Sequence, residues 1–299
     1  MEAGNLPAYD GIQAFDFTRA PFRLNADAEP FQVAEEMAAC FEVVAGMPAK
    51  MTRCAQAAMF SIGLADDVPL VRAAATLAAE IDAGVGDGRA NPYHNSQHFC
   101  EALLSVLYLS ALASMPPLIR ARMVSAALAH DFHHDGRNSI GAPFRLERLA
   151  AQASLPYFDA AGVAADEQTR IATLILATET TAGVPFARKC YDHFFKGADQ
   201  PEPPPAEPHL AVLAQDASLA EQAVMLSESD LLASVGLTVF YGELTQANLS
   251  KEWGRPMTAV DKLFFLERIF GDFKVGRFFS PNVTRLKEAM RKKADAIKR

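Results

Sequence analysis

Two short blocks of the chain concentrate histidine and aspartate at spacings that suit metal binding. The first runs from Tyr93 to His98 and the second from His130 to Asn138, and together they hold five of the seven histidines. Imidazole combined with carboxylate suits Zn²⁺, Mn²⁺, Fe²⁺ or Co²⁺, whereas Mg²⁺ prefers oxygen ligands and water. A cluster this dense is difficult to attribute to chance, so the two blocks predict a metal site.

The spacing within the blocks indicates which side chains can face one ion. His94 and His98 are four residues apart at the start of an expected helix, where side chains at i and i+4 share a face. His130 and Asp131 are adjacent at the end of another expected helix, and a helix terminus can present both to one ion. The blocks thus supply His98, His130 and Asp131, and a second carboxylate must come from elsewhere.

Asp230 is the candidate for that second carboxylate. It lies on an expected helix over residues 209–233 that is otherwise apolar around this position. A carboxylate there is costly to bury unless it is paired or binds a metal. Taken alone, an Asp in a helix is more often an ordinary surface residue, so Asp230 becomes a ligand candidate only in the company of the histidine blocks.

Composition and charge restrict the classes of partner. The 299 residues carry a net charge of −8, with a pI of about 5.4. An acidic surface argues against nucleic acid or an anionic membrane as the main partner. The N-terminus shows no signal-peptide pattern, and no apolar run approaches the ~18–20 residues of a spanning helix. The cysteines are scattered without a C-x-x-C pair, as is typical of buried free thiols in a reducing compartment. We therefore expect a cytoplasmic protein.

Apolar residues recur at intervals of three and four along most of the chain, which predicts helices. No convincing period-two run is found, so we expect an all-α fold: a compact multi-helix bundle with the metal site between helices. The expected helices cover about 31–44, 48–63, 68–83, 95–114, 118–131, 143–154, 165–182, 185–194, 209–233, 237–249, 258–271 and 282–298.

The expected domain organisation is simple. Residues 1–30 lack periodicity and are predicted to form an N-terminal arm, and residues 31–299 a single helical domain. The Pro-rich stretch 200–208 is interpreted as an exposed loop, because Asp230 beyond it belongs to the same site. Three aromatic residues are expected to anchor the arm on the body: Phe15, Phe17 and Phe22.

Four segments of the chain resemble, in order, the motifs of the class I cyclic-nucleotide phosphodiesterases. They extend over residues 90–270, and the wider relation is to the HD-type metallophosphohydrolases. The segments are Tyr93–His98 with Glu101 (similar to Y-H-N-x-x-H-A-x-D), His130–Asn138 (H-D-x-x-H-x-G-x-x-N), Ile175–Glu179 (V-L-A-T-D) and Ser229–Leu231 (A-D-L).

The resemblance implies two metal ions and a set of residues that hold them. The tighter ion, Zn²⁺ or similar, would have four ligands: His98, His130, Asp131 and Asp230. Asp131 would also bridge to a second ion, Mg²⁺ or Mn²⁺. Three further residues would orient the water molecules on that second ion: His134, Glu147 and Thr178.

The same resemblance implies an activity and a mechanism. His94 matches the family's general acid, and Tyr93 and Asn95 would shape the turn that presents it beside the substrate. The substrate would be a small phosphoester, a 3′,5′-cyclic nucleotide (cAMP, cGMP or both), cleaved to the 5′-monophosphate. Hydroxide formed between the two ions would attack phosphorus, while protonated His94 would donate a proton to the leaving 3′ oxygen, a contribution of about 10²–10⁴-fold.

The resemblance fails where the family reads the purine. Trp253–Met257 resembles the loop before the base-reading helix, and Asp261–Phe270 resembles that helix. Phe265 can serve as the aromatic wall, but the expected glutamine falls near Asp261 or Lys262. We keep Phe265 and Lys262 as candidate substrate contacts, although ordinary helix core explains the phenylalanine equally well.

Two alternatives therefore remain open. The missing glutamine favours a metallophosphohydrolase that acts on another phosphoester, such as a nucleotide monoester or a non-purine diester. A ligand-sensing module without activity is the third interpretation, and loss of a metal ligand would favour it, but none is lost. Residues 1–90 could cap the pocket, form a homodimer or complete the bundle.

Overall fold

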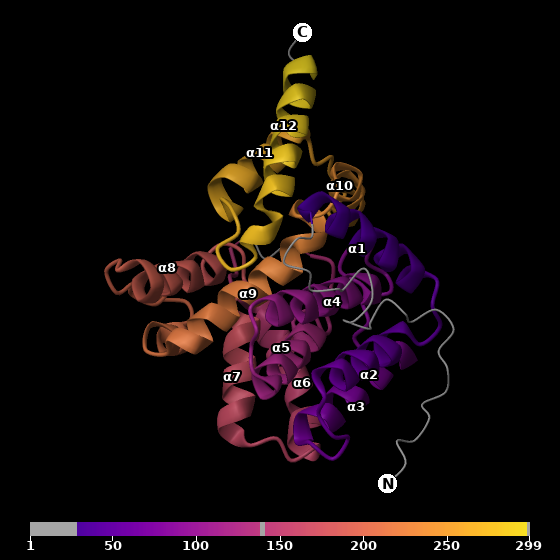
Figure 1. Cartoon of the computed structure of the whole chain (residues 1–299), viewed down its shortest axis with the longest axis vertical. Coiled ribbons are helices and arrows are strands. Elements are labelled where there is room, and N and C mark those ends of the chain that lie inside the picture. The colour runs from indigo at the N-terminus through magenta and orange to yellow at the C-terminus, as the bar shows by residue number, and fades with distance from the viewer. Residues whose placement is uncertain (1–28, 138–140, 298–299) are drawn as a thin grey trace.

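Two long apolar helices pack against each other at the centre of the structure, a computed structural model that describes residues 29–137 and 141–297. These are α4 (Ser96–Leu112) and α9 (Ala217–Val235). Most of their side chains are buried, as expected for helices that are apolar around most of their circumference. Figure 1 shows α9 crossing the middle of the molecule, with α4 and α5 (Pro117–Ala129) beside it.

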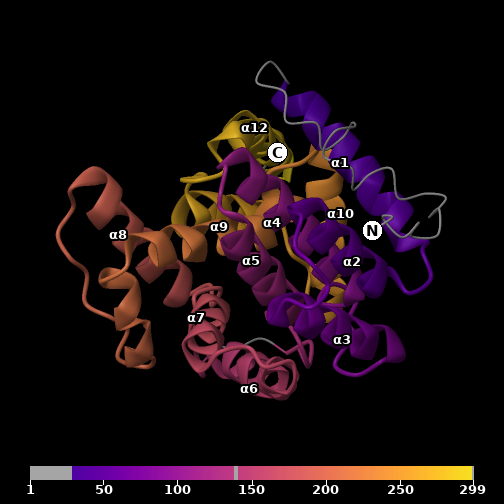
Figure 2. The same ribbon diagram turned by 60° about the horizontal axis from the view of Figure 1, so that its bottom comes forward.

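The other helices surround this pair (Figures 1 and 2). The described residues contain no strand, so the predicted all-α class is confirmed. The surrounding elements are α1 (Pro30–Ala45), α2 (Lys50–Ile62), α3 (Pro69–Ala83), α6 (Arg145–Ala160), α7 (Ala165–Leu176), α8 (Gly183–Lys196), α10 (Val239–Glu252), α11 (Ala259–Phe264) and α12 (Ser280–Ile297), with the short helices η2 (Pro208–Ala214), η3 (Phe265–Phe270) and η4 (Arg277–Phe279).

The helix predicted over 165–182 is shorter than expected. It ends at Leu176, and a new helix, α8, begins at Gly183. The carboxylate of Glu179 accepts hydrogen bonds from the backbone N–H groups of Ala182 (2.6 Å) and Gly183 (3.2 Å). These bonds satisfy donors that a helix start leaves without a partner, and they turn the chain at this point.

Two other predicted helices are each divided. Asp216 separates η2 from α9, because its side chain accepts a hydrogen bond from the backbone N–H of Leu219 (3.0 Å) and caps the longer helix. The helix predicted over 258–271 forms as α11 followed by η3, where the winding changes to that of a π-helix.

A continuous cluster of buried apolar side chains extends from Val33 on α1 to Ala294 on α12. The predicted arm falls almost wholly on residues 1–28, which lie outside the described part of the chain, so the arm and its three phenylalanines stay a prediction. No single described helix is long and apolar enough to cross a membrane, and the bent pair α9–α10, which turns by 98°, passes only on combined length and composition.

Glu228 on α9 anchors the C-terminal part of the chain to the central helices. Its buried carboxylate accepts hydrogen bonds from the backbone N–H groups of Lys274, Val275 (3.0 Å) and Gly276 (2.7 Å). Arg188 on α8 adds an ion pair at 3.3 Å. Burial raises the pKa of Glu228, and these donors act against that rise.

Glu228→Ala is expected to destabilise the fold by about 3–5 kcal/mol, because it leaves buried donors and a buried guanidinium without their acceptor. Urea denaturation followed by circular dichroism measures the change. Glu243→Ala is the control: Glu243 pairs with Lys293 at 2.7 Å on the surface, where an ion pair contributes about 1 kcal/mol or less. Similar losses in both variants would contradict the anchoring role.

Candidate active site

Helix packing in the core brings the four predicted metal ligands together. α4 packs against both α5 and α9. His98 lies in the first turn of α4, and Asp230 lies in the second half of α9. His130 and Asp131 lie in the turn directly after α5, which ends at Ala129 instead of at the His-Asp pair as predicted. The contacts that bury the core therefore also fix the positions of these side chains.

The ligand atoms are separated by distances that suit a bound ion. Nε2 of His98 lies 3.0 Å from Oδ1 of Asp230 and 3.3 Å from Oδ2 of Asp131. Nε2 of His130 lies 3.6 and 3.3 Å from the same two oxygens, and 3.4 Å from Nε2 of His98. A tetrahedral ion with bonds of about 2.0–2.2 Å has ligand atoms about 3.3–3.6 Å apart. His98, His130 and Asp230 therefore form a group spaced to share a zinc-like ion, and Asp131 lies 3.3 Å from both imidazoles.

The electrostatics of the cluster also favour a cation. Burial opposes charge on all four groups, but the two carboxylates raise the pKa of His98 and His130 above the usual range. The imidazoles in turn lower the pKa of Asp131 and Asp230. Positive charge is thus held between two carboxylates, and a divalent cation can replace the imidazole protons that supply it.

His130 has the outer hydrogen bond that a metal-binding histidine needs. Its Nδ1 faces the carbonyl oxygen of Ala127 at 2.8 Å, which leaves Nε2 as the nitrogen for the ion. Nδ1 of His98 is buried without a hydrogen-bond partner in the described part of the chain. The side chains of Asp131 and Asp230 are 15% and 16% exposed, against 2% for both histidines, so the carboxylate side of the site is the accessible one.

Glu147 supplies an unpaired acceptor beside this cluster, as a second ion with bound waters would need. Its Oε2 is buried and has no hydrogen-bond partner among the described residues. Burial raises the pKa of Glu147 to about 7, and the nearby charges of Glu179, Asp131 and Asp230 add to the rise. The hydroxyl of Thr178 donates to the Ile175 carbonyl oxygen at 2.8 Å, so its lone pairs can accept. The water-orienting roles of His134, Glu147 and Thr178 stay predictions.

His94, the predicted general acid, is held by Glu252 at the end of α10. One oxygen of Glu252 accepts from Nδ1 of His94, and the other accepts from the backbone N–H groups of Tyr93 (2.8 Å) and His94 (2.9 Å). Burial alone would raise the pKa of Glu252, but these hydrogen bonds lower it, so it stays ionised. Because Nδ1 is engaged, Nε2 is the nitrogen that can exchange a proton with a substrate.

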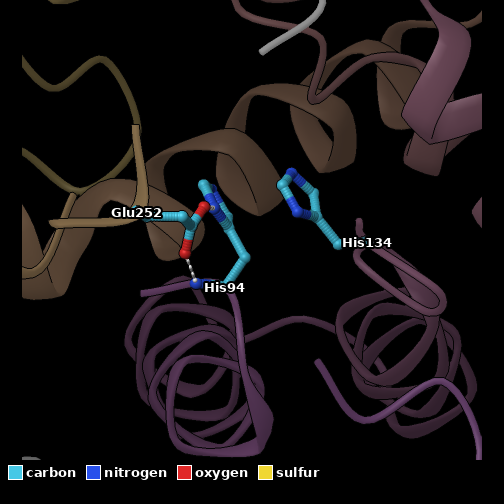
Figure 3. Close-up of side chains that lie close together, drawn as sticks. All are labelled: His94, His134 and Glu252. Carbon is cyan, nitrogen blue, oxygen red and sulfur yellow. Dashed lines mark hydrogen bonds and ion pairs between the residues drawn. The ribbon is translucent and has the colours of Figure 1, made fainter. Parts of the chain in front are cut away.

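The ring of His134 stacks on one face of the His94 ring (Figure 3). The two rings are 3.9 Å apart between centroids and only 20° from parallel. Burial lowers the pKa of His134 to about 4, with a further contribution from His94, so His134 is neutral near pH 7. Its Nδ1 accepts from the backbone N–H of Gly136 at 3.0 Å, which assigns its proton to Nε2.

By distance alone, His94, His134 and Glu252 form a second possible metal group, since their ligand atoms lie within 4.8 Å of one another. The stacking argues against an ion there. A metal binds imidazole in the plane of the ring, and the lone pairs of two nearly parallel rings cannot converge on one point between the planes. We interpret these three side chains as a group that holds a proton and not a metal ion.

The remaining predicted residues near His94 have contacts within the turn. Asn95 caps α4, because its Oδ1 accepts from the backbone N–H of Gln97 at 2.9 Å. The ring of Tyr93 lies 4.8 Å from the ring of His98, between centroids. Burial, and next the charge of Asp230, raises the pKa of Tyr93 well above its usual range, so the hydroxyl stays protonated. Both residues shape the turn, and a contact with substrate stays a prediction.

Lys262 and Phe265 lie together on the α11–η3 helix. Nζ of Lys262 is 5.9 Å from the centroid of the Phe265 ring. Lys262 is buried, and burial lowers the pKa of its ammonium to about 8. Among the described residues, its ammonium has no hydrogen bond or ion pair. A groove of about 640 Å³ lies between α10 and α12, but its lining includes neither Lys262 nor any metal ligand, so the substrate-binding role of Lys262 and Phe265 stays a prediction.

Two residues that contact His94 or His134 were not expected from the sequence. Glu252 is separated from His94 by 158 residues, and a Glu near a helix end carries no local signal of its role. Asn91 precedes Tyr93 by two residues, and its side chain donates to the carbonyl oxygens of His94 and His134. The only feature of the sequence that indicates such a role for Asn91 is its position at the end of a glycine-rich loop, just before the first block. Asn138, the last residue of the second motif, lies outside the described residues.

Comparison with solved structures identifies the fold. The phosphodiesterase domain of the RhoPDE fusion protein from the choanoflagellate Salpingoeca rosetta superposes with a TM-score of 0.59 at 15% identity, covering 88% of this chain and 92% of that domain. A second structure, of the phosphodiesterase domain of Salpingoeca rosetta rhodopsin phosphodiesterase, gives 0.61 at 14% identity and 94% of both chains.

A third solved structure, LmjPDEB1 in complex with IBMX, gives a TM-score of 0.57 at 14% identity, with 95% of this chain and 94% of that chain covered. No protein-family model matches the chain, and no curated protein matches it in sequence. The chain therefore has the fold of phosphodiesterase catalytic domains, as its motifs predicted.

Asp230→Ala is expected to abolish tight metal binding, because it removes one of the two carboxylates that face the imidazoles. Metal content after dialysis, measured by inductively coupled plasma mass spectrometry, tests this. Glu221→Ala, on the same helix but away from the cluster, should bind metal like the wild type. If Asp230→Ala kept the wild-type stoichiometry while folded by circular dichroism, the ligand assignment would be wrong.

Proposed function

We propose that the protein is a metal-dependent 3′,5′-cyclic-nucleotide phosphodiesterase that produces the 5′-monophosphate. The supporting observation is that Nε2 of both His98 and His130 lies 3.0–3.6 Å from one oxygen each of Asp131 and Asp230, although these residues come from segments far apart in the sequence. Beside them stands a histidine held by a carboxylate. The likeness to phosphodiesterase domains adds to this proposal through the fold.

The residues of the chain divide the work. His98, His130, Asp131 and Asp230 would hold the tighter ion, Zn²⁺ or similar, and Asp131 with Glu147 would face the second, Mg²⁺ or Mn²⁺. When bound, two such ions supply a nucleophile at neutral pH and neutralise the phosphodiester charge.

The proton follows a separate path. Glu252 keeps Nδ1 of His94 engaged, so Nε2 donates its proton to the 3′ oxygen of the substrate. The proton arrives as the bond between that oxygen and phosphorus breaks. A proton is needed because an alkoxide is a poor leaving group, and general acid catalysis contributes about 10²–10⁴-fold. His134, neutral and stacked on His94, supports the ring without adding a second positive charge.

A second candidate function is hydrolysis of a different phosphoester, such as a nucleotide monoester or a non-purine diester. Lys262 favours it. A buried ammonium offers donors and no acceptor, so it suits an oxygen of the substrate better than a purine edge that presents both donor and acceptor. An inactive sensing module is the least favoured interpretation, because all four predicted ligands are present. Cytoplasmic location and a homodimer stay predictions.

A substrate panel tests the proposal. The purified protein, loaded with Zn²⁺, Mg²⁺ or Mn²⁺, is offered cAMP, cGMP, nucleoside monophosphates and a chromogenic aryl phosphodiester. We expect turnover of at least one cyclic nucleotide to its 5′-monophosphate, detected by chromatography. Turnover of the aryl diester but of neither cyclic nucleotide would favour the second candidate. Metal binding without turnover of any substrate would rule out both.

His94→Ala is expected to leave metal bound and to slow cyclic-nucleotide cleavage by about 10²–10⁴-fold, with little effect on an aryl diester whose leaving group needs no proton. Glu252→Gln should also slow cyclic-nucleotide cleavage. The glutamine amide would place an N–H donor against the backbone N–H groups of Tyr93 and His94, which the carboxylate accepts from. Glu243→Gln, on the same helix, is the control. Equal slowing of both substrates in His94→Ala would argue against the general acid.

A further inference from the structure

The loop between α3 and α4 lies directly against both histidine blocks. The carbonyl oxygen of Gly86 accepts from the backbone N–H of His133 at 3.0 Å. A Cβ on Gly86 would stand 2.6 Å from the Phe132 ring, and one on Gly88 would stand 2.1 Å from the carbonyl oxygen of His94. Both glycines also have φ of +61°, a conformation that other residues rarely adopt. The loop can make these contacts only with glycine at both positions.

Asn91, at the end of this loop, connects the two blocks through one amide group. Its Nδ2 donates to the carbonyl oxygen of His94 and to that of His134, both at 2.9 Å. The backbone of Asn91 is itself fixed, since its N–H donates to Gly88 (2.7 Å) and its carbonyl oxygen accepts from the side chain of Asn95 (2.8 Å). A side-chain amide nitrogen carries two N–H donors, whereas a carboxylate has none.

The two hydrogen bonds of the Asn91 amide set the distance between His94 and the turn after α5 that carries His130 and Asp131. His94 belongs to the segment before α4, and His134 follows the predicted ligands His130 and Asp131 by four and three residues. With their carbonyl oxygens held by the same nitrogen, the rings of His94 and His134 stack at 3.9 Å. Glu252 orients the His94 ring from another helix, and its carboxylate also lies within 4.8 Å of a His134 ring nitrogen. Its hydrogen bonds among the described residues go to Tyr93 and His94, so it does not tie the two segments together as Asn91 does.

We propose that Asn91 is a positioning residue for proton donation: it holds the general acid His94 at a fixed distance from the metal ligands. This inference rests on the proposed phosphodiester hydrolysis for its catalytic consequence, but not for its structural one. A residue that merely stabilised the loop would affect every substrate alike. A residue that positions the acid affects only reactions that need the proton.

Asn91→Asp is the sharpest variant, because it keeps the shape of the side chain and removes both donors. Asn282→Asp is the matched control: Nδ2 of Asn282, buried on α12, likewise donates to two backbone carbonyl oxygens, those of Pro30 (3.2 Å) and Gly236 (2.8 Å). Both changes should destabilise the fold to a similar degree, and only the first touches the site.

The first measurement compares the turnover of a cyclic nucleotide with that of an aryl diester by the metal-loaded proteins. In Asn91→Asp, with metal content unchanged, cyclic-nucleotide turnover should fall by about 10–10²-fold, the size expected for a misplaced catalytic group, while aryl diester turnover should stay within about threefold. Asn282→Asp should alter the two substrates equally. Equal losses in Asn91→Asp, or loss of its metal, would overturn the proposal. If Asn91→Asp does not fold, Asn91→Ser, which adds no charge, should show the same ratio change at smaller size.

The second measurement does not depend on activity. Nuclear Overhauser effects between the ring protons of His94 and His134, observed with labelled histidine, report the stacking. They should be present in the wild type and in Asn282→Asp and be lost in Asn91→Asp. Retained stacking in Asn91→Asp would overturn the positioning role. If the wild type hydrolyses no substrate, the proposed function fails, and this comparison still decides whether Asn91 fixes the two rings.

Discussion

The structure depends on four ionisable groups that are buried against one another. Asp131 and Asp230 would repel if they stood alone, and His98 and His130 could not carry charge inside an apolar core without them. Their mutual attraction balances the loss of hydration only when the geometry is close. A cation between them would improve that balance further, so the fold must hold these four groups at close distances.

Rigid packing of the helical core holds these four groups in place. α4 and α9 are buried on nearly all sides, so neither can shift without disturbing the whole bundle. Side chains placed on such elements keep their positions better than side chains on loops. His98 and Asp230 are therefore fixed by the apolar residues around them, and His130 and Asp131 by the end of a third packed helix.

Sequence reasoning succeeded where the signal is local and failed where it is spatial. The all-α class followed from apolar periodicity, and the four metal-ligand candidates that the structure brings together were recognised from their spacing and their motifs. Helix ends at Leu176 and Ala129 were missed, because side-chain caps and turns decide them. Glu252 and Asn91 were not expected, because their contacts with His94 and His134 depend on tertiary structure that no spacing rule encodes. The division into an arm and a single domain stays a prediction.

The location of Glu252 on α10 has a consequence for how such a protein can diverge. The predicted metal ligands come from α4, the end of α5, and α9, whereas the carboxylate that holds His94 and the predicted substrate contacts Lys262 and Phe265 lie on α10 and the α11–η3 helix. On the proposed function, substitutions in the later helices would alter leaving-group and substrate preference without disturbing the predicted metal ligands. Core packing tolerates extensive apolar exchange at constant volume. A bundle built in this way can have the same overall fold as another chain at only 14–15% sequence identity.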